Sequence, residues 1–207
     1  KIIPDSELVY GPASVDFDIP AFILEQGGFL SSYQEEVDGE LMSGAAIIQR
    51  IAHEYSVNPR LLLALIEYQS GWVTNPNPDE ITTDYPAGLI NDWRKGLYLQ
   101  LAWAANNLNR GYYLWRVNGI GAWVTFDGAI VPISPTINAG TAGIQYFFTQ
   151  LYDRPKWETA VTESGLFQTY HPLPLFKYMP SERRDSGRRQ DKSISKLVKL
   201  ERSRETA

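Results

Sequence analysis

The segment from Asn58 to Gly71 constrains the fold more than any other part of this chain. It reads NPRLLLALIEYQSG. Asparagine is a favoured N-cap, proline suits the first helical position, and glycine commonly ends a helix. Residues 61–66 are all aliphatic or alanine, so this helix is apolar on every face and must be buried. We therefore expect a fold built around one central helix over residues 59–70.

Further segments have the periodicity of helices, and one has that of a hairpin. Apolar residues recur at helical spacing over residues 43–55, 93–109, 139–151 and 156–170. Gly111 is expected to end the second of these helices. The run VTFDGAIV alternates around Asp127-Gly128, a pair typical of a tight turn. Residues 73–92 are rich in Pro, Asn and Asp and predict a long loop that either shapes a site or is disordered. The expected fold class is mainly α, with one small β-hairpin.

Composition divides the chain into three parts. Residues 1–42 are punctuated by proline and glycine, so we expect an extended N-terminal lead-in packed on the domain, with one short helix near 20–26. Residues 43–180 carry the helical patterns and form the domain itself. Residues 181–207 hold 9 Lys/Arg against 5 Asp/Glu, whereas the preceding residues hold 10 against 19. This basic tail is expected to be flexible, and contact with phosphates or an anionic wall polymer is the alternative.

The residues that the chain lacks exclude several classes of function. It has no cysteine and only two histidines, His53 and His171. Disulfide scaffolds, cysteine-ligated metals and thiol nucleophiles are therefore excluded, and no metal or other cofactor is expected. Both histidines are expected to be structural or exposed. There is no phosphate-binding glycine loop and no GxSxG motif, and the longest aliphatic run is far shorter than the ~20 residues of a membrane span.

Glu67 is the first candidate for chemistry, because it interrupts the apolar central helix. A carboxyl group there is expected to be substantially desolvated. Burial without a partner favours the protonated form, and a protonated carboxylic acid at neutral pH suits general acid catalysis. The alternative is a structural role in which Glu67 pairs with an arginine, such as Arg50 or Arg94. The carboxylates of residues 79, 80 and 84 in the long loop are candidates for a second acid.

Aromatic residues suggest a second kind of chemistry, because many fall in or beside the predicted loops. They are Trp72, Tyr85, Trp93, Tyr112, Tyr113, Trp115 and Trp123. Aromatic side chains with a polar group suit sugar rings, which stack on the ring face while their hydroxyls bind the N–H or O–H. Tyr85, Tyr112 and Tyr113 are therefore candidate substrate-binding residues. Core packing is the alternative for each of these aromatics.

Three segments in order resemble a known family. The helix from Asn58 ends in Gln69-Ser70-Gly71-Trp72, Gly88-Leu89-Ile90-Asn91 follows, and Ile137-Asn138-Ala139-Gly140 comes last. In this order they resemble the Glu-Ser, Gly-Leu-Met-Gln and Tyr-Asn-Ala-Gly motifs of soluble lytic transglycosylases and goose-type lysozymes. The resemblance covers about residues 43–151. It implies a lysozyme-like helical domain that acts on peptidoglycan.

The chain departs from this family at three key positions. The family's catalytic Glu falls on Gln69, its substrate-contacting Gln on Asn91, and its site Tyr on Ile137. A glutamine amide cannot donate the proton that a glycosidic oxygen needs as it leaves. Glu67 is the obvious substitute, and the mechanism that the resemblance implies needs only one carboxylate. Two residues on a helix are about 200° apart, however, so Glu67 points away from Gln69 unless the helix end is shifted.

These observations lead to two expected functions. The first is a lysozyme-like protein that either cleaves N-acetylated cell-wall glycan such as peptidoglycan, using Glu67, or binds it without cleavage. Binding would use hydrogen bonds from Gln69, Ser70, Asn91 and Asn138. The second is a non-catalytic structural or protein-interaction module of a secreted or surface protein. A groove between the end of the central helix, the 73–92 loop and Asn138 would favour glycan.

Location and partners are inferred more broadly. The resemblance, and a chain that starts at Lys1 rather than Met, imply a secreted, periplasmic or cell-surface protein from which an export signal has been removed. Trimming of the chain would explain the same start. The acidic composition of residues 1–180 argues against a nucleic-acid partner. We expect a monomer with no membrane span.

Overall fold

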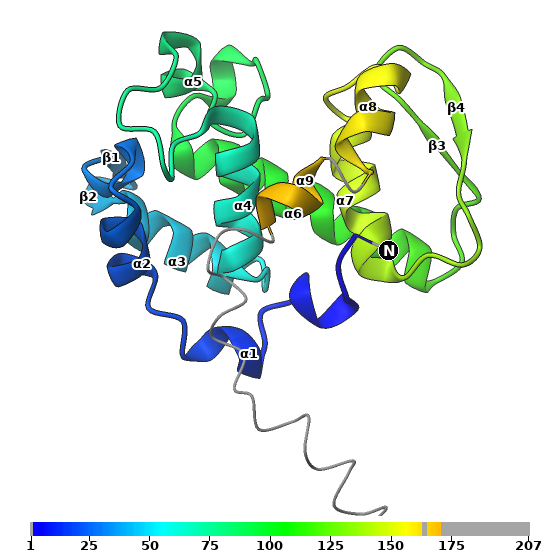
Figure 1. Ribbon diagram of the computed structural model, residues 1–207, viewed down its shortest axis with the longest axis horizontal. Helices are drawn as coiled ribbons and strands as arrows, with labels where there is room; N and C mark the ends of the chain where they lie inside the picture. The colour runs from blue at the N-terminus through cyan, green and yellow to red at the C-terminus, as the bar shows by residue number, and fades with distance from the viewer. Residues whose placement is uncertain (1, 163–164, 171–207) are drawn as a thin grey trace, which may run out of the picture. The chain divides into compact units, whose positions relative to one another are not determined.

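The predicted central helix is α4, Pro59–Ser70, in the computed structural model of the protein, which describes residues 2–162 and 165–170 (Figure 1). The Asn58 side chain accepts a hydrogen bond from the N–H of Arg60, and Pro59 occupies the first turn. Gly71 ends the helix in the left-handed region, with φ of 69°. Every residue from 59 to 66 is buried. The sequence therefore predicted both the ends and the burial of α4 correctly.

Two helices pack directly on α4, and two more extend the packing beyond them. Helix α3, Gly44–Glu54, and the short α9, Leu166–Tyr170, pack directly on it. The long helix α6, Leu97–Arg116, packs on α3 and most extensively on α7, Ala139–Thr149. Figure 1 shows α6 passing behind α4 towards α7. The core is the apolar interior that these helices enclose, and its largest fully buried side chains include Trp72, Trp123, Phe147 and Phe148.

The prediction that Gly111 ends a helix was wrong, because α6 continues through it to Arg116. Gly111 instead lies where α6 crosses α7. A Cβ at this position would lie 2.4 Å from the Cβ of Tyr146 and 2.9 Å from the carbonyl oxygen of Ala142. Gly143 on the facing helix is equally tight, because its Cβ would lie 2.7 Å from the carbonyl oxygen of Leu108. The two glycines thus allow the helices to approach more closely than side chains would permit.

The first 43 residues are more structured than the extended lead-in that the sequence predicted. They contain a 3-10 turn η1, Asp5–Glu7, helix α1, Pro12–Val15, helix α2, Ile19–Gln26, and a second 3-10 turn η2, Phe29–Ser31. They also contain an antiparallel hairpin of β1, Gln34–Val37, and β2, Glu40–Ser43. Helix α2 confirms the helix expected near 20–26. The hairpin was missed, although its turn residues Asp38 and Gly39, both with positive φ, are typical of such a turn.

The second half of the chain contains the predicted hairpin and two short helices. Strands β3, Ala122–Val124, and β4, Ile130–Pro132, pair antiparallel around Asp127-Gly128, as predicted. The helix expected over 156–170 is two helices, α8, Arg154–Ala160, and α9. The expected 73–92 loop contains a short helix α5, Glu80–Asp84, and is followed by a 3-10 turn η3, Asp92–Arg94. The described residues are therefore mainly helical with two small hairpins, which confirms the predicted fold class.

Three further predictions concern the N-terminal lead-in, the C-terminal tail and the absence of a membrane span. The described residues all belong to one compact unit, residues 1–175, in which the first 42 residues are not separate from the rest. The basic tail at 181–207, the end of the predicted domain at 171–180, and His171 lie outside the described residues. Within the described residues, none of the helices has both the length and the apolar character needed to cross a membrane.

Candidate functional site

Gln69 lies where the C-terminal ends of α4 and α7 meet. Its Oε1 accepts a hydrogen bond of 2.6 Å from the hydroxyl of Tyr152, which follows α7 by three residues. Tyr152 is buried, and its burial raises the pKa of its hydroxyl to about 12. Tyr152 therefore remains a neutral hydrogen-bond donor over the physiological pH range. Nothing in the sequence pattern indicated this partner of Gln69.

Gly88 covers the other side of the Gln69 amide. It has φ of 86°, a conformation that favours glycine, and a Cβ at this position would lie 3.1–3.2 Å from the three amide atoms. The amide nitrogen Nε2 is buried and has no hydrogen-bond partner within the described part of the chain. The first two motifs of the resemblance, at Gln69 and at Gly88, are thus in contact.

Aromatic rings form one side of this site. The Phe148 ring lies 5.5 Å from that of Tyr68 and is stacked on that of Tyr152 at 5.3 Å. The exposed Lys156 places its Nζ 4.2 Å from the centre of the Tyr152 ring. Burial raises the pKa of Tyr68 as well. The site around Gln69 is therefore bordered by aromatic rings, and within the part of the chain that the structure describes Lys156 is the cation found against the Tyr152 ring.

Glu67 is on a different face of α4 from Gln69, as the helical rotation requires. Its side chain is half-buried rather than fully desolvated, and it binds the loop that follows α4. Oε2 accepts hydrogen bonds from the backbone N–H groups of Val73 and Thr74, at 3.0 and 3.1 Å. Oε1 accepts a hydrogen bond of 2.5 Å from the hydroxyl of Thr74. The carboxylate therefore fixes the chain reversal after Gly71.

Neither arginine proposed as a partner of Glu67 forms an ion pair with it. Arg50 instead binds Asp38 and Glu54. No ion pair of Arg94 is found among the described residues. The structure thus gives Glu67 backbone and hydroxyl partners, which sequence periodicity does not reveal.

The 85–95 segment forms the other side of the site. Gln100 on α6 binds it through both amide atoms, accepting from the N–H of Leu89 and donating to the carbonyl oxygens of Leu89 and Arg94. The Asn91 side chain accepts from the N–H of Trp93 and so caps η3 rather than pointing freely outward. This arrangement holds the Trp93 side chain in solvent, with 90% of its surface exposed.

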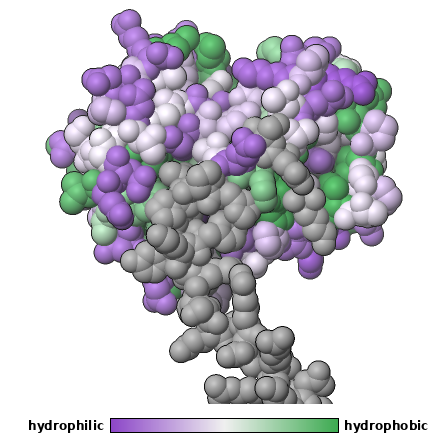
Figure 2. All heavy atoms as spheres, viewed as in Figure 1, coloured by the Kyte–Doolittle hydropathy of each residue, from purple (hydrophilic) through white to green (hydrophobic). Residues whose placement is uncertain are grey.

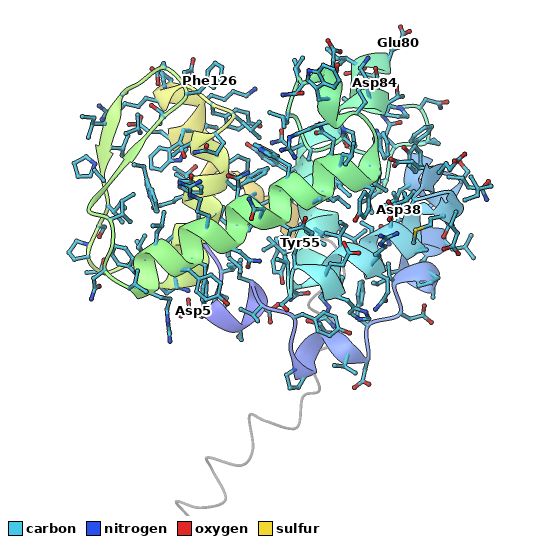
Figure 3. All side chains as sticks on the ribbon, turned by 180° about the vertical axis from the view of Figure 1, so that it is seen from behind. Asp5, Asp38, Tyr55, Glu80, Asp84 and Phe126 are labelled. Atoms are coloured by element: carbon cyan, nitrogen blue, oxygen red, sulfur yellow. The ribbon has the colours of Figure 1, made fainter. Side chains whose placement is uncertain are left out.

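Tyr85 belongs to the same segment and is part of a charged cluster. Its hydroxyl donates a 2.9 Å hydrogen bond to Asp92, and the Nζ of Lys95 lies 2.9 Å from Asp84. The hydrogen bond from Tyr85 and the nearby Lys95 ammonium lower the pKa of Asp92. Figure 3 shows Glu80 and Asp84 at the outer edge of the molecule. The Asp84 carboxylate is paired with Lys95, and among the described residues no hydrogen bond joins it to Gln69.

The other predicted site residues lie apart from Gln69 or use their polar groups internally. The Ser70 hydroxyl donates to the carbonyl oxygen of Ile66. Asn138 is the N-cap residue of α7, so the length of α7, about 16 Å, separates it from Tyr152. Tyr112 and Tyr113 form an edge-to-face pair near the C-terminal end of α6, about 18 Å along that helix from Gln100. Gln69 and Ser70 thus lie at the end of α4, and Tyr85 and Asn91 lie on the segment whose Gly88 contacts Gln69. Asn138, Tyr112 and Tyr113 lie elsewhere.

The surface above the end of α4 is hollowed. Figure 2 shows an indentation at the top of the molecule between the part that carries α5 and the part that carries α8. Figure 1 places the C-terminal ends of α4 and α7 between these two parts. We define the amide site as Gln69 with Tyr152 and Gly88, which contact it, together with the exposed Trp93 five residues after Gly88 on the same segment. Nothing in the described residues resembles a metal centre, because no group of three or more His, Cys, Asp or Glu side chains is close enough together.

These features define a mainly helical domain with a candidate site at a buried amide, which the Tyr152 hydroxyl and Gly88 contact. Comparison of the sequence with known families gives a more particular assignment. Residues 1–182 match the family described as "LasA, N-terminal domain", and the chain belongs to that family. No curated protein and no solved structure matches the chain.

Proposed function

We propose that the chain is a lysozyme-like domain that binds an N-acetylated cell-wall glycan, such as peptidoglycan, at the amide site without cleaving it. The observation that carries this proposal is the amide of Gln69 at the position where the resemblance would have a catalytic acid. Tyr152 and Gly88 fit closely around this neutral side chain. The proposal implies a location at the cell surface, in the periplasm or outside the cell.

The competing version, in which Glu67 cleaves the glycan, is less well supported by the geometry. Its carboxylate accepts three hydrogen bonds from Val73 and Thr74. These bonds engage both carboxylate oxygens in holding the loop after α4. Glu67 also faces the loop after α4 rather than the amide site. We therefore assign Glu67 a structural role.

The amide site offers two kinds of contact that suit an N-acetylated sugar. An amide and an acetamido group each have one carbonyl acceptor and N–H donors, so they pair with each other, and Gln69 Nε2 has an unused donor. Gly88 covers this nitrogen, so a ligand reaches it only if the 85–91 segment moves aside. The exposed indole of Trp93 provides a flat apolar face with an N–H at its edge, on which a sugar ring stacks.

Titration with the β-1,4-linked tetramer of N-acetylglucosamine, followed by calorimetry, tests the proposal. We expect the wild type to bind and Trp93→Ala to weaken binding at least tenfold, because stacking is lost. Tyr113→Ala is the matched control, since it removes another exposed aromatic side chain distant from the amide site. Equal affinities in Trp93→Ala and the wild type, or no binding by the wild type, would count against glycan binding at this site.

A protein-interaction module is the second candidate, and one observation favours it. The outer face of the β3–β4 hairpin is apolar, with Val124 and Ile130 directly paired and 58% and 68% exposed, and with Phe126 75% exposed. Exposed apolar residues that cluster in this way are typical of interaction surfaces. This candidate becomes the better account if Val124→Ser/Ile130→Ser abolishes co-purification of a protein partner while the glycan tetramer fails to bind the wild type.

A further inference from the structure

A cavity of about 610 Å³ lies at the end of α7 opposite to the amide site. Its walls come from the N-terminal segment, from the start of α7 and from α9. The lining residues are Ile2, Ile3, Pro4, Asp5, Ser6, Asn138 and Phe167. The volume is within the range of cavities that hold small ligands or peptide side chains. This cavity is not part of the site proposed above.

The Asp5 carboxylate is built into the wall of this cavity. Its Oδ1 accepts hydrogen bonds from the Asn138 amide at 2.7 Å and from the N–H of Gly140 at 2.8 Å. The Asn138 amide also donates to the carbonyl oxygen of Ile3 at 2.7 Å, so neither of its N–H groups remains available. These bonds fix the position of Asp5, which Figure 3 shows on the N-terminal segment.

The second oxygen of Asp5 is the main unused polar group of the cavity. Among the described residues, no hydrogen bond or ion pair is made by Oδ2 of Asp5. Ser6 is an exposed lining residue next to Asp5 in the sequence, and none of the seven lining residues is a cation. The cavity thus combines apolar walls from Ile2, Ile3 and Phe167 with a fixed, partly unpaired carboxylate. A charge-assisted hydrogen bond to a cationic donor is the strongest interaction that such a wall can make.

The geometry points to a binding site for the side chain of a lysine or arginine in a peptide segment. The apolar walls cover the methylene stem, and the ammonium or guanidinium group binds Oδ2 of Asp5. Two sources can supply this side chain. One is the basic segment 181–207 of this chain, which carries nine Lys and Arg residues. The other is a separate molecule.

Calorimetric titration of the full chain with N-acetyl-leucyl-lysine amide tests the site. N-acetyl-leucyl-norleucine amide is the matched probe, because it keeps the apolar stem and lacks the charge. Asp5→Asn retains an acceptor for Asn138 and Gly140 but removes the charge. Ser6→Lys places a competing cation at the rim without removing any side-chain hydrogen bond found among the described residues. Asp16→Asn, on an exposed residue outside the cavity, is the control for a change of net charge.

We expect the lysine probe to bind at least tenfold more tightly than the norleucine probe, and each cavity variant to reduce its affinity at least tenfold. Asp16→Asn should behave as the wild type. A variant in which the nine basic residues of 181–207 are replaced by glutamine separates the two sources. Tighter probe binding to this variant identifies the segment as the occupant, and unchanged binding identifies a separate molecule. Equal affinity for the two probes, or no binding to either the wild type or the glutamine variant, would overturn the proposal.

Discussion

The Tyr152 hydroxyl lies 2.6 Å from the amide oxygen of Gln69 and joins the C-terminal ends of α4 and α7. A carboxylate at position 69 would accept the same hydrogen bond, so the surroundings are compatible with either an acid or an amide. The side chain at this position is glutamine, whose amide cannot act as a proton donor. Under the proposed function, position 69 is therefore the place where a single substitution separates binding from cleavage.

If the proposed function holds, Gln69→Glu should give the protein a lytic activity. The new carboxyl supplies the proton donor that the leaving glycosidic oxygen needs, and we expect at least a tenfold rise in the release of soluble fragments from peptidoglycan. Gln34→Glu, an exposed position on β1, is the control for the same chemical change. If an assay able to detect a tenfold gain shows none, glycan does not lie against residue 69.

Glu67→Gln should destabilise the fold while leaving glycan binding intact. The substitution removes the charge that strengthens the hydrogen bonds from Val73 and Thr74, and it gives one carboxyl position a donor in place of an acceptor. We expect a loss of about 1–3 kcal/mol in the free energy of unfolding, measured by urea denaturation. Unchanged stability combined with loss of a wild-type lytic activity would show that Glu67 is catalytic.

Tyr152→Phe should alter the dependence of stability on alkaline pH. The pKa of Tyr152 rises from 10.0 to about 12 on folding, chiefly because the side chain is buried. Between these values the unfolded chain loses this proton and the folded chain keeps it, so stability falls as pH rises. The fall in unfolding free energy from pH 10 to 12 should therefore be shallower in Tyr152→Phe than in the wild type. Parallel curves for the two proteins would contradict the assigned burial.

Gly111→Ala should destabilise the protein even though alanine favours helices. The gain in helix propensity is about 1 kcal/mol, but the new Cβ meets the Cβ of Tyr146 at 2.4 Å. Overpacking of this kind costs about 1–3 kcal/mol. One of the close neighbours is the backbone carbonyl oxygen of Ala142, which cannot move aside as a flexible side chain can. Gly121→Ala is the control, because nothing lies within 4 Å of its Cβ position. Thermal unfolding of the two variants should show a lower midpoint only for Gly111→Ala.

Local signals predicted much of the fold. The caps Asn58 and Gly71 and the apolar run between them fixed α4, and Asp127-Gly128 fixed the β3–β4 turn. Gly111 was misassigned because a helix-ending glycine and a glycine at a helix crossing have the same local sequence. Only the position of α7, far along the chain, distinguishes them. The β1–β2 hairpin was missed although its turn signal was present in the sequence.

The candidate site was less predictable, because it depends on contacts between distant segments. The contact of Gln69 with the Gly88 segment is consistent with the order of the sequence motifs. The expected convergence with Asn138 does not occur, since α7 carries that residue to its far end and Asn138 binds Ile3 and Asp5 there. The sequence did not indicate that Tyr152 donates a hydrogen bond to Gln69, because a tyrosine after an apolar helix is equally typical of core packing.

Incubation of the purified protein with peptidoglycan sacculi tests the central claim most directly. Sedimentation measures retention of the protein on the sacculi, and mass spectrometry of the supernatant measures released fragments. We predict that the wild type is retained and releases no soluble muropeptides, that Trp93→Ala is retained poorly, and that Gln69→Glu releases fragments. Release by the wild type, or a wild type that stays in the supernatant, would contradict the assignment of a non-cleaving glycan-binding domain.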